Sequence, residues 1–183
     1  MNPVTCSESR ILVGKWVSLL RMTAPSNSPR YGALAWFLIA TFAAAAVGTV
    51  ATFRGVTTWY PLLAKPAWTP PSALFGPVWT ALYIAMAVAA WRVWRIRTGA
   101  KATAAVSTYG CQLLLNALWS VLFFGLRRPD FALIDIVALW AILAILLVRY
   151  WRADRWAGAL WTPYFLWVSF ASALNGSIWD LNR

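Results

Sequence analysis

Amide and aromatic side chains recur at helical spacing inside the apolar runs of this chain. Three helix faces result, formed by Tyr109, Gln112, Asn116 and Trp119, by Trp79 and Tyr83, and by Tyr164, Trp167, Ala171 and Asn175. Each face combines flat rings with a few hydrogen-bonding groups, which predicts a pocket for a large, flat and mostly apolar ligand. The alternative is that the amides tie neighbouring helices together, which is their commoner use inside a membrane.

The residue types that ordinary catalysis and metal binding require are scarce. The chain has no histidine and two cysteines, Cys6 in a polar segment and Cys111 in an apolar run. We therefore predict no metal site and no required cofactor. Asp135 is the one acidic residue well inside an apolar run, and a lone carboxyl makes a poor proton relay; pairing with an arginine such as Arg128 is the alternative. Ordinary enzyme chemistry is not expected.

The apolar runs dominate the composition. Of the 183 residues, 61% are hydrophobic and 11% are charged, which leaves too little polar surface for a soluble domain. Five stretches are long enough to cross the hydrocarbon core of a bilayer, roughly 30 Å, as helices. They lie at residues 33–53, 75–94, 104–126, 131–151 and 156–179. The predicted fold is an all-α integral membrane protein, a five-transmembrane-helix bundle, that occupies residues 33–183.

The net charge of +11 is carried mainly by segments that flank these spans. Basic residues in such places set topology and meet anionic lipid headgroups, so membrane lipids are expected partners and nucleic acid is not. The N-terminal segment and the second and fourth loops hold 11 of the 16 basic residues. This asymmetry predicts a cytoplasmic N-terminus and, in a bacterium, the inner membrane.

Residues 1–32 form a basic extension that precedes the first span. Within it, RILVGKWVSLLRM alternates basic and apolar residues and can lie on a membrane surface as an amphipathic helix. Met22 opens the polar stretch MTAPSNSPRYG, so a start at Met22, which would remove most of the extension, is the alternative.

The connection at residues 54–74 is long and rich in proline, whereas the later loops are short. A long loop of this kind usually has a function. Proline fixes its own φ and restricts the residue before it, so this segment is expected to be stiff. We predict that it forms a lid over the pocket, with the lid residues Lys65, Pro66, Trp68, Pro70 and Pro71.

Three segments resemble the signature segments of the TspO/MBR family, the translocator proteins or tryptophan-rich sensory proteins. They are WYPLLAKPAWTPPSALFGPVWTALY at 59–83, QLLLNALWSVLFFG at 112–125 and WTPYFLWVSFASALN at 161–175. The resemblance to bacterial members implies a five-helix bundle, commonly a homodimer, with a pocket closed by the first loop. It also implies binding of porphyrin or haem-related tetrapyrroles, and it leaves the outer membrane as an alternative location.

Matched position by position, Tyr60, Trp79, Asn116 and Trp167 correspond to pocket residues of the family. Trp79 and Trp167 also match the indole pair implicated in light-dependent porphyrin breakdown by some members. The predicted function is binding or sensing of tetrapyrroles and other flat hydrophobic ligands; the alternatives are enzyme-like porphyrin degradation and transport of a small molecule. The predicted ligand-binding residues are Tyr60, Trp79, Tyr83, Gln112, Asn116, Trp119, Trp167 and Ala171.

Overall fold

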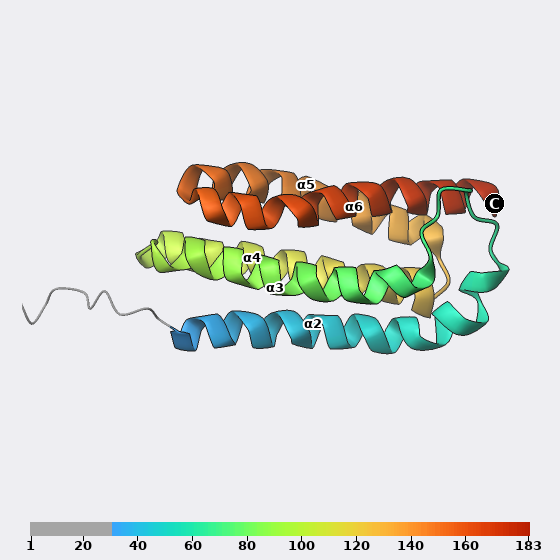
Figure 1. The fold of residues 1–183 in the computed structure, drawn as a ribbon, viewed down its shortest axis with the longest axis horizontal. Helices are drawn as coiled ribbons and strands as arrows, with labels where there is room; N and C mark the ends of the chain where they lie inside the picture. The colour runs from blue at the N-terminus through green and yellow to red at the C-terminus, as the bar shows by residue number, and fades with distance from the viewer. Residues whose placement is uncertain (1–30) are drawn as a thin grey trace, which may run out of the picture. The chain divides into compact units, whose positions relative to one another are not determined.

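Five long helices make up the part of the chain that the computed structural model describes, residues 31–183. They are α2 (Tyr31–Thr58), α3 (Phe75–Arg95), α4 (Gly99–Ser120), α5 (Pro129–Ala153) and α6 (Arg155–Leu181). The helices lie side by side, and successive helices run in opposite directions (Figure 1). The predicted all-α, five-helix fold class is confirmed. The amphipathic stretch and the alternative start at Met22 lie outside the described residues.

Four helical segments are long and apolar enough to cross a membrane: Tyr31–Thr58, Ser72–Arg95, Gly99–Gly125 and Pro129–Ala153. The fifth helix, α6, is 27 residues long and contains Pro163. Its lower hydropathy follows from its composition, since tryptophan, tyrosine, asparagine and serine replace many of the aliphatic residues that fill α5. Among these side chains, Trp161, Tyr164 and Asn175 are buried in the interior of the bundle, whereas Trp156 is exposed.

The helices extend beyond the apolar runs from which they were predicted. α2 continues past residue 53 to Thr58, and α4 begins at Gly99 rather than near residue 104. The extra turns arise because a helix needs no apolar side chains at its ends; it continues until a residue such as Pro61 interrupts it. Gly99 starts α4 with a φ of 54°, a conformation that glycine adopts without strain.

Short helical turns complete the loops of the bundle. The connection between α2 and α3 contains two 3-10 turns, η1 (Tyr60–Leu62) and η2 (Ser72–Leu74). α4 is extended by a π-helical turn, η3 (Val121–Gly125). A π turn inside a helix is rare and frequently lies at a functional site.

Two glycines bring α2 close to the end of α4. A Cβ atom on Gly55 would lie 2.6 Å from the backbone oxygen of Phe124, and one on Gly48 would lie 3.2 Å from Oγ of Ser120. Both contacts are within the bundle. Glycine is therefore required at position 55 for α2 to lean on η3.

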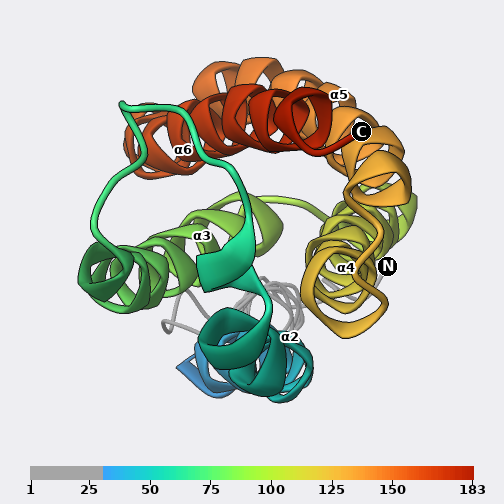
Figure 2. The ribbon, with the colours of Figure 1, turned by 90° about the vertical axis from the view of Figure 1, so that its right-hand side faces the viewer.

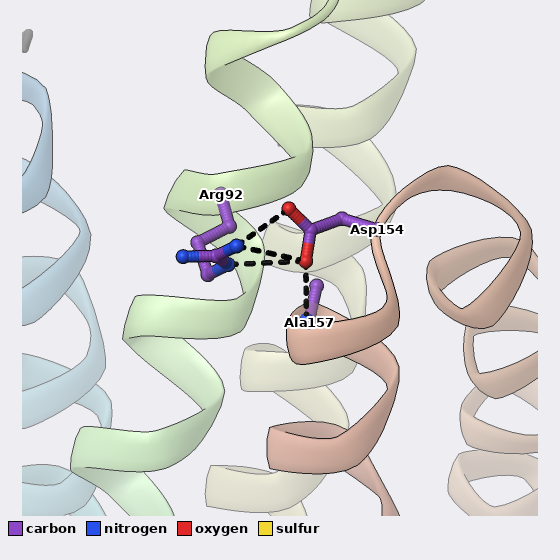
Figure 3. A network of polar contacts seen from close by, with 3 residues as sticks. All are labelled: Arg92, Asp154 and Ala157. Carbon is purple, nitrogen blue, oxygen red and sulfur yellow. Dashed lines mark hydrogen bonds and ion pairs between the residues drawn. The ribbon is translucent and has the colours of Figure 1, made fainter.

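The opposite end of the bundle is held by an ion pair between α3 and the turn that joins α5 to α6. Asp154 is the N-cap of α6 and accepts a hydrogen bond from the amide of Ala157 at 2.9 Å. Nε and Nη2 of Arg92 donate to the same carboxylate at 2.7–3.1 Å (Figure 3). The turn itself is tight, because a Cβ on Gly158 would lie 2.9 Å from Cα of Trp151.

Candidate ligand-binding cavity

A cavity of about 600 Å³ lies inside the bundle, at the end covered by the loop between α2 and α3. Figure 2 views the bundle from this end and shows the loop running from α2 across to α6 and back to α3. The lining side chains come from α2, α3, the end of α4 with η3, and α6, with further contributions from η1 and η2. The volume lies within the range of typical small-molecule sites, roughly 300–1,000 Å³.

Aromatic rings form a large part of the cavity wall. The ring centroids of Trp79 and Tyr83 are 5.3 Å apart on successive turns of α3. Trp119 stacks on Phe123 at 5.1 Å, where α4 passes into η3. Mutual packing of this kind restricts ring rotation, so the wall presents flat, preformed surfaces.

A chain of hydrogen bonds behind the wall joins α3, α4 and α6. Tyr83 donates its hydroxyl to Oδ1 of Asn116 at 3.0 Å, and Nδ2 of Asn116 donates to the hydroxyl of Tyr164 at 3.1 Å. Tyr164 in turn donates to Oε1 of Gln112 at 2.9 Å, and Nε2 of Gln112 donates to Sδ of Met86. Both amides therefore tie helices together, which is the alternative that the sequence left open.

A second tie links α4 to α6 and to the start of α5. Nε1 of Trp119 donates to Oδ1 of Asn175 at 2.9 Å, and Nδ2 of Asn175 donates to the backbone oxygen of Pro129 at 2.8 Å. The indole of Trp119 thus offers its ring to the cavity while its N–H is used within the protein.

Trp167 differs from these residues because its indole N–H has no partner. Within residues 31–183, the buried side-chain polar atoms without a hydrogen bond are Nε1 of Trp167 and the two carboxylate oxygens of Asp135. Trp167 lines the cavity and Asp135 does not. An unsatisfied buried donor costs about 1–3 kcal/mol. Trp167 is thus a residue of the cavity lining that keeps an unused donor.

The pairing of Asp135 with Arg128 that the sequence allowed does not form. Arg128 instead donates to Asp130, two residues away, at 2.7 and 3.0 Å. Asp135 is 7% exposed and lies on α5, five residues after Asp130. The alternative of a pairing between Asp135 and Arg128 is thus wrong, because the guanidinium of Arg128 binds the carboxylate of Asp130, which is nearer along the chain.

The cavity lining, as far as the structure describes it, contains no acidic or basic side chain. Its polar groups are hydroxyls, amides and indole N–H groups, and most of them are already hydrogen-bonded within the protein. A charged group buried in such a place would lose its hydration without compensation. The cavity accordingly suits an uncharged, flat surface with few acceptors.

The structure brings most of the predicted ligand-binding residues together. The residues that line the cavity are Tyr60, Trp79, Tyr83, Asn116, Trp119, Trp167 and Ala171. Gln112 is fully buried and lies outside the lining. One face of α2, which includes Phe42, Ala45, Thr49, Thr52 and Val56, also lines the cavity and was not predicted. Its spacing of three and four residues was the available signal.

Comparison with known proteins identifies the origin of this arrangement. Residues 36–180 match the TspO/MBR family, which is more than half of the chain. The chain belongs to the TspO/MBR family.

Relatives from bacteria and animals cover most of the bundle. A tryptophan-rich protein TspO from Chlorobaculum tepidum is 41% identical over 74% of this chain and 86% of its own length. The tryptophan-rich sensory protein of Cereibacter sphaeroides is 37% identical over 80% of this chain and 92% of its own length. The human translocator protein is 36% identical over 68% of this chain and 75% of its own length. The TspO/MBR sequence pattern therefore spans the described helices.

The side chain of Lys65 holds together the loop that is predicted to be a lid. Nζ of Lys65 donates to the backbone oxygens of Tyr60 at 2.9 Å, Leu63 at 2.8 Å and Pro61 at 3.3 Å, and it lies 5.0 Å from the centre of the Tyr60 ring. The ammonium group thereby binds carbonyl groups in and beside the short turn η1, where the carbonyl of Tyr60 also accepts the amide of Leu63 at 3.3 Å. The charged group of Lys65 binds the backbone of the loop, and Lys65 does not line the cavity.

The same loop is attached to the end of α6. The backbone of Ala64 and the side chain of Asn182 exchange two hydrogen bonds, at 3.0 and 2.9 Å. Trp68 packs edge-on against Phe170 at 5.6 Å. The predicted lid residues, namely Lys65, Pro66, Trp68, Pro70 and Pro71, are not themselves in the cavity lining, to which the loop contributes Tyr60 and Ser72.

Proposed function

We propose that this TspO/MBR-family membrane protein binds tetrapyrroles, such as porphyrin or haem-related compounds, and other flat hydrophobic molecules in the aromatic cavity. The observation that carries the proposal is the combination of an uncharged lining of flat rings with one unused donor, Nε1 of Trp167. The ligand-binding residues are those of the predicted set that line the cavity. The loop at 59–74 closes the cavity at its aqueous end.

The names of the relatives agree with a binding function. One is called a sensory protein and another a translocator protein, and both activities begin with binding of a molecule. Binding is thus the shared step that we assign to this chain. Sensing and transfer of the bound molecule are the two consequences between which the proposal leaves a choice.

The proposed orientation has the N-terminus in the cytoplasm and, in a bacterium, the inner membrane. Basic residues gather at the end of the bundle where α2 begins and α3 and α5 end, and they are Arg92, Arg95, Arg97, Lys101, Arg149, Arg152 and Arg155. Segments this basic are retained on the cytoplasmic side and meet anionic lipid headgroups. The homodimer that is common in the family is proposed for this chain as well.

Binding is tested by titration of the purified full-length protein with protoporphyrin IX, followed by porphyrin absorbance and tryptophan fluorescence. Saturable changes are expected in both signals. Trp167→Phe keeps a flat ring and removes the donor, so the lost hydrogen bond, about 0.5–1.5 kcal/mol, should raise Kd by roughly 2- to 12-fold. Trp140→Phe is the matched control, because Trp140 is 39% exposed on the outer surface and its indole bonds to Ser169.

Either of two outcomes would contradict the proposal. Absorbance that changes linearly with porphyrin concentration, without saturation, would indicate partition into detergent or lipid. Equal Kd values for the wild type, Trp167→Phe and Trp140→Phe would show that the porphyrin does not occupy the cavity beside Trp167.

A second candidate function is light-dependent breakdown of the bound porphyrin. It is favoured by one observation, that Trp79 and Trp167 line the same cavity on facing helices. Illumination of the complex should then yield a new absorbing product, and Trp79→Phe should suppress that product while binding persists. Equal bleaching of the porphyrin with and without protein would exclude this function and leave the binding proposal intact.

A further inference from the structure

One side of the cavity is lined by residues that are also exposed on the outer surface of the bundle. Between the loop and the contact of Phe42 with Tyr83, these residues are Ala46, Thr49 and Phe53 on α2, and Gly76 and Thr80 on α3; Phe42 and Ser72, at the two limits, are exposed as well. A side chain that lines an enclosed cavity is buried, so a group of residues that are both cavity-lining and exposed marks an opening. We call this group the lateral mouth.

The lateral mouth has clear limits along the two helices. Towards the basic end of the bundle, the rings of Phe42 and Tyr83 meet with centroids 6.3 Å apart, and beyond them Tyr31 stacks on Trp91. These ring pairs close the space between α2 and α3. Towards the other end lies the loop that covers the bundle. The opening therefore lies between two helices, below that loop.

The chemistry of the lateral mouth is compatible with hydrocarbon. Ala46 and Gly76 have no polar side-chain atoms. The hydroxyl of Thr49 donates to the backbone oxygen of Ala45 at 2.9 Å, and that of Thr80 donates to the backbone oxygen of Gly76 at 2.9 Å. No hydroxyl at the rim needs water, which is the condition for a surface that faces lipid. The small side chains also leave room between the helices, since a Cβ on Gly76 would meet nothing within 4 Å.

The depth of the lateral mouth places it in the hydrocarbon region. Thr49 lies nine residues before the end of α2 at Thr58. At 1.5 Å per residue this is about 14 Å. The 28 residues of α2 are about 42 Å long and exceed a core of roughly 30 Å by about 6 Å at each end of a centred helix, which places Thr49 about 8 Å inside the hydrocarbon. A molecule that passes through it comes from lipid and not from water.

The aqueous end of the cavity is closed by a fastened loop. Lys65 binds three backbone oxygens of the loop, and Asn182 attaches the backbone of Ala64 to the end of α6. Entry at this end would require these bonds to break, whereas the lateral mouth is already open. The fastened loop and the open lateral mouth therefore both favour entry of the ligand between α2 and α3.

We propose that ligands enter and leave the cavity laterally, through the lateral mouth between α2 and α3, from solution in the bilayer. This inference rests on the proposed function and specifies its ligand class: molecules that are dissolved in the hydrocarbon region and whose flat, uncharged part passes between Thr49 and Thr80. Charged substituents of such a ligand remain at the level of the headgroups.

The test compares two phenylalanine substitutions one helical turn apart on α3. Thr80→Phe places a ring in the lateral mouth, and Ile84→Phe places one at an exposed position, 46% accessible, that does not line the cavity. The full-length protein is reconstituted in vesicles, and protoporphyrin IX is supplied from donor vesicles in stopped-flow measurements. Thr80→Phe should slow both binding and release by roughly tenfold. Ile84→Phe should match the wild type.

The source of the ligand is tested in the same experiment. If entry is lateral, the binding rate at a fixed total concentration follows the mole fraction of porphyrin in the lipid. Wild-type rates for Thr80→Phe, with saturable binding preserved, would overturn lateral entry and leave the proposed function standing. Faster exchange in Asn182→Ala, together with unchanged rates in Thr80→Phe, would locate the route under the loop. Absence of saturable binding by the wild type would refute the proposed function, and lateral entry with it.

Discussion

Replacing Asp154 by alanine should destabilise the bundle by roughly 2–4 kcal/mol. The carboxylate accepts a hydrogen bond from the amide of Ala157 as the N-cap of α6, and loss of such a cap costs about 1 kcal/mol. It also accepts two-pronged hydrogen bonds from Arg92 at 2.7–3.1 Å, and a hydrogen bond to a charged group contributes about 1.5–3 kcal/mol. Both side chains are mostly buried, with 14% and 22% exposed, so water replaces these bonds poorly.

Two further variants separate the cap from the ion pair. Asp154→Asn keeps a side-chain oxygen that can cap α6 but removes the charge, so it should lose only part of the stability. Arg92→Ala combined with Asp154→Ala completes a double-mutant cycle, in which neighbours of this kind couple by about 0.5–3 kcal/mol. Additive effects of the two alanine substitutions would contradict a direct interaction.

The ion pair also predicts how stability depends on pH. Burial alone raises the pKa of the Asp154 carboxyl, but the hydrogen bonds from Arg92 and from the Ala157 amide outweigh burial and hold the pKa below its ordinary value of 3.8. A carboxyl with a lowered folded-state pKa binds its proton more weakly when folded. Its contribution is therefore complete above the ordinary pKa and is lost as the pH falls through the folded-state pKa.

The measurement is reversible unfolding in a fixed detergent mixture, followed by circular dichroism at a series of pH values. The stability difference between the wild type and Asp154→Asn should be constant near neutral pH and should shrink in acid below the ordinary aspartate pKa. A difference that stays constant down to the lowest pH at which the protein folds would refute the assignment of this stability to the ionised carboxylate.

Two more substitutions test the packing of the bundle by the same unfolding measurement. Gly158→Ala should destabilise the protein by about 1–3 kcal/mol, because its Cβ would lie 2.9 Å from Cα of Trp151; Gly76→Ala, with open space around it, should not. Asn116→Leu should lower stability by about 1 kcal/mol, since it removes two interhelical hydrogen bonds of roughly 0.6 kcal/mol each; an unchanged unfolding midpoint would show that these bonds contribute nothing.

Helical periodicity correctly predicted which side of a helix faces the interior of the bundle. It did not predict how far along the bundle axis each of these residues lies. Gln112 and Asn116 share a face of α4, but Gln112 lies one turn, about 6 Å, further from the lid. The cavity occupies only the lid half of the bundle, so Asn116 reaches its wall and Gln112 does not. A repeat of three and four residues contains no information on depth, which depends on how neighbouring helices diverge.

Contacts between segments far apart in the sequence could not be predicted from the sequence either. The attachment of Ala64 to Asn182 joins residues 118 positions apart, and neither residue type indicates its partner. Beside Phe42, Phe53 and Val56, the face of α2 that lines the cavity consists of alanine, threonine and glycine, which look like ordinary packing residues. Such small side chains line a cavity only where the facing helix stays away, and that distance is a property of the assembled bundle.

The position of α2 explains why the cavity lies at the lid end of the bundle. Near its start, α2 packs against α3, with Tyr31 stacked on Trp91. Near its end, the missing side chain of Gly55 lets α2 lean on the backbone of Phe124 in η3. Because α2 packs against α3 near its start and against η3 near its end, space remains between α2 and α3 at the lid end, where both helices line the cavity. The space between them is the cavity and its lateral mouth, so a larger residue at Gly55 should alter the site by displacing η3 and with it the lining residue Phe124.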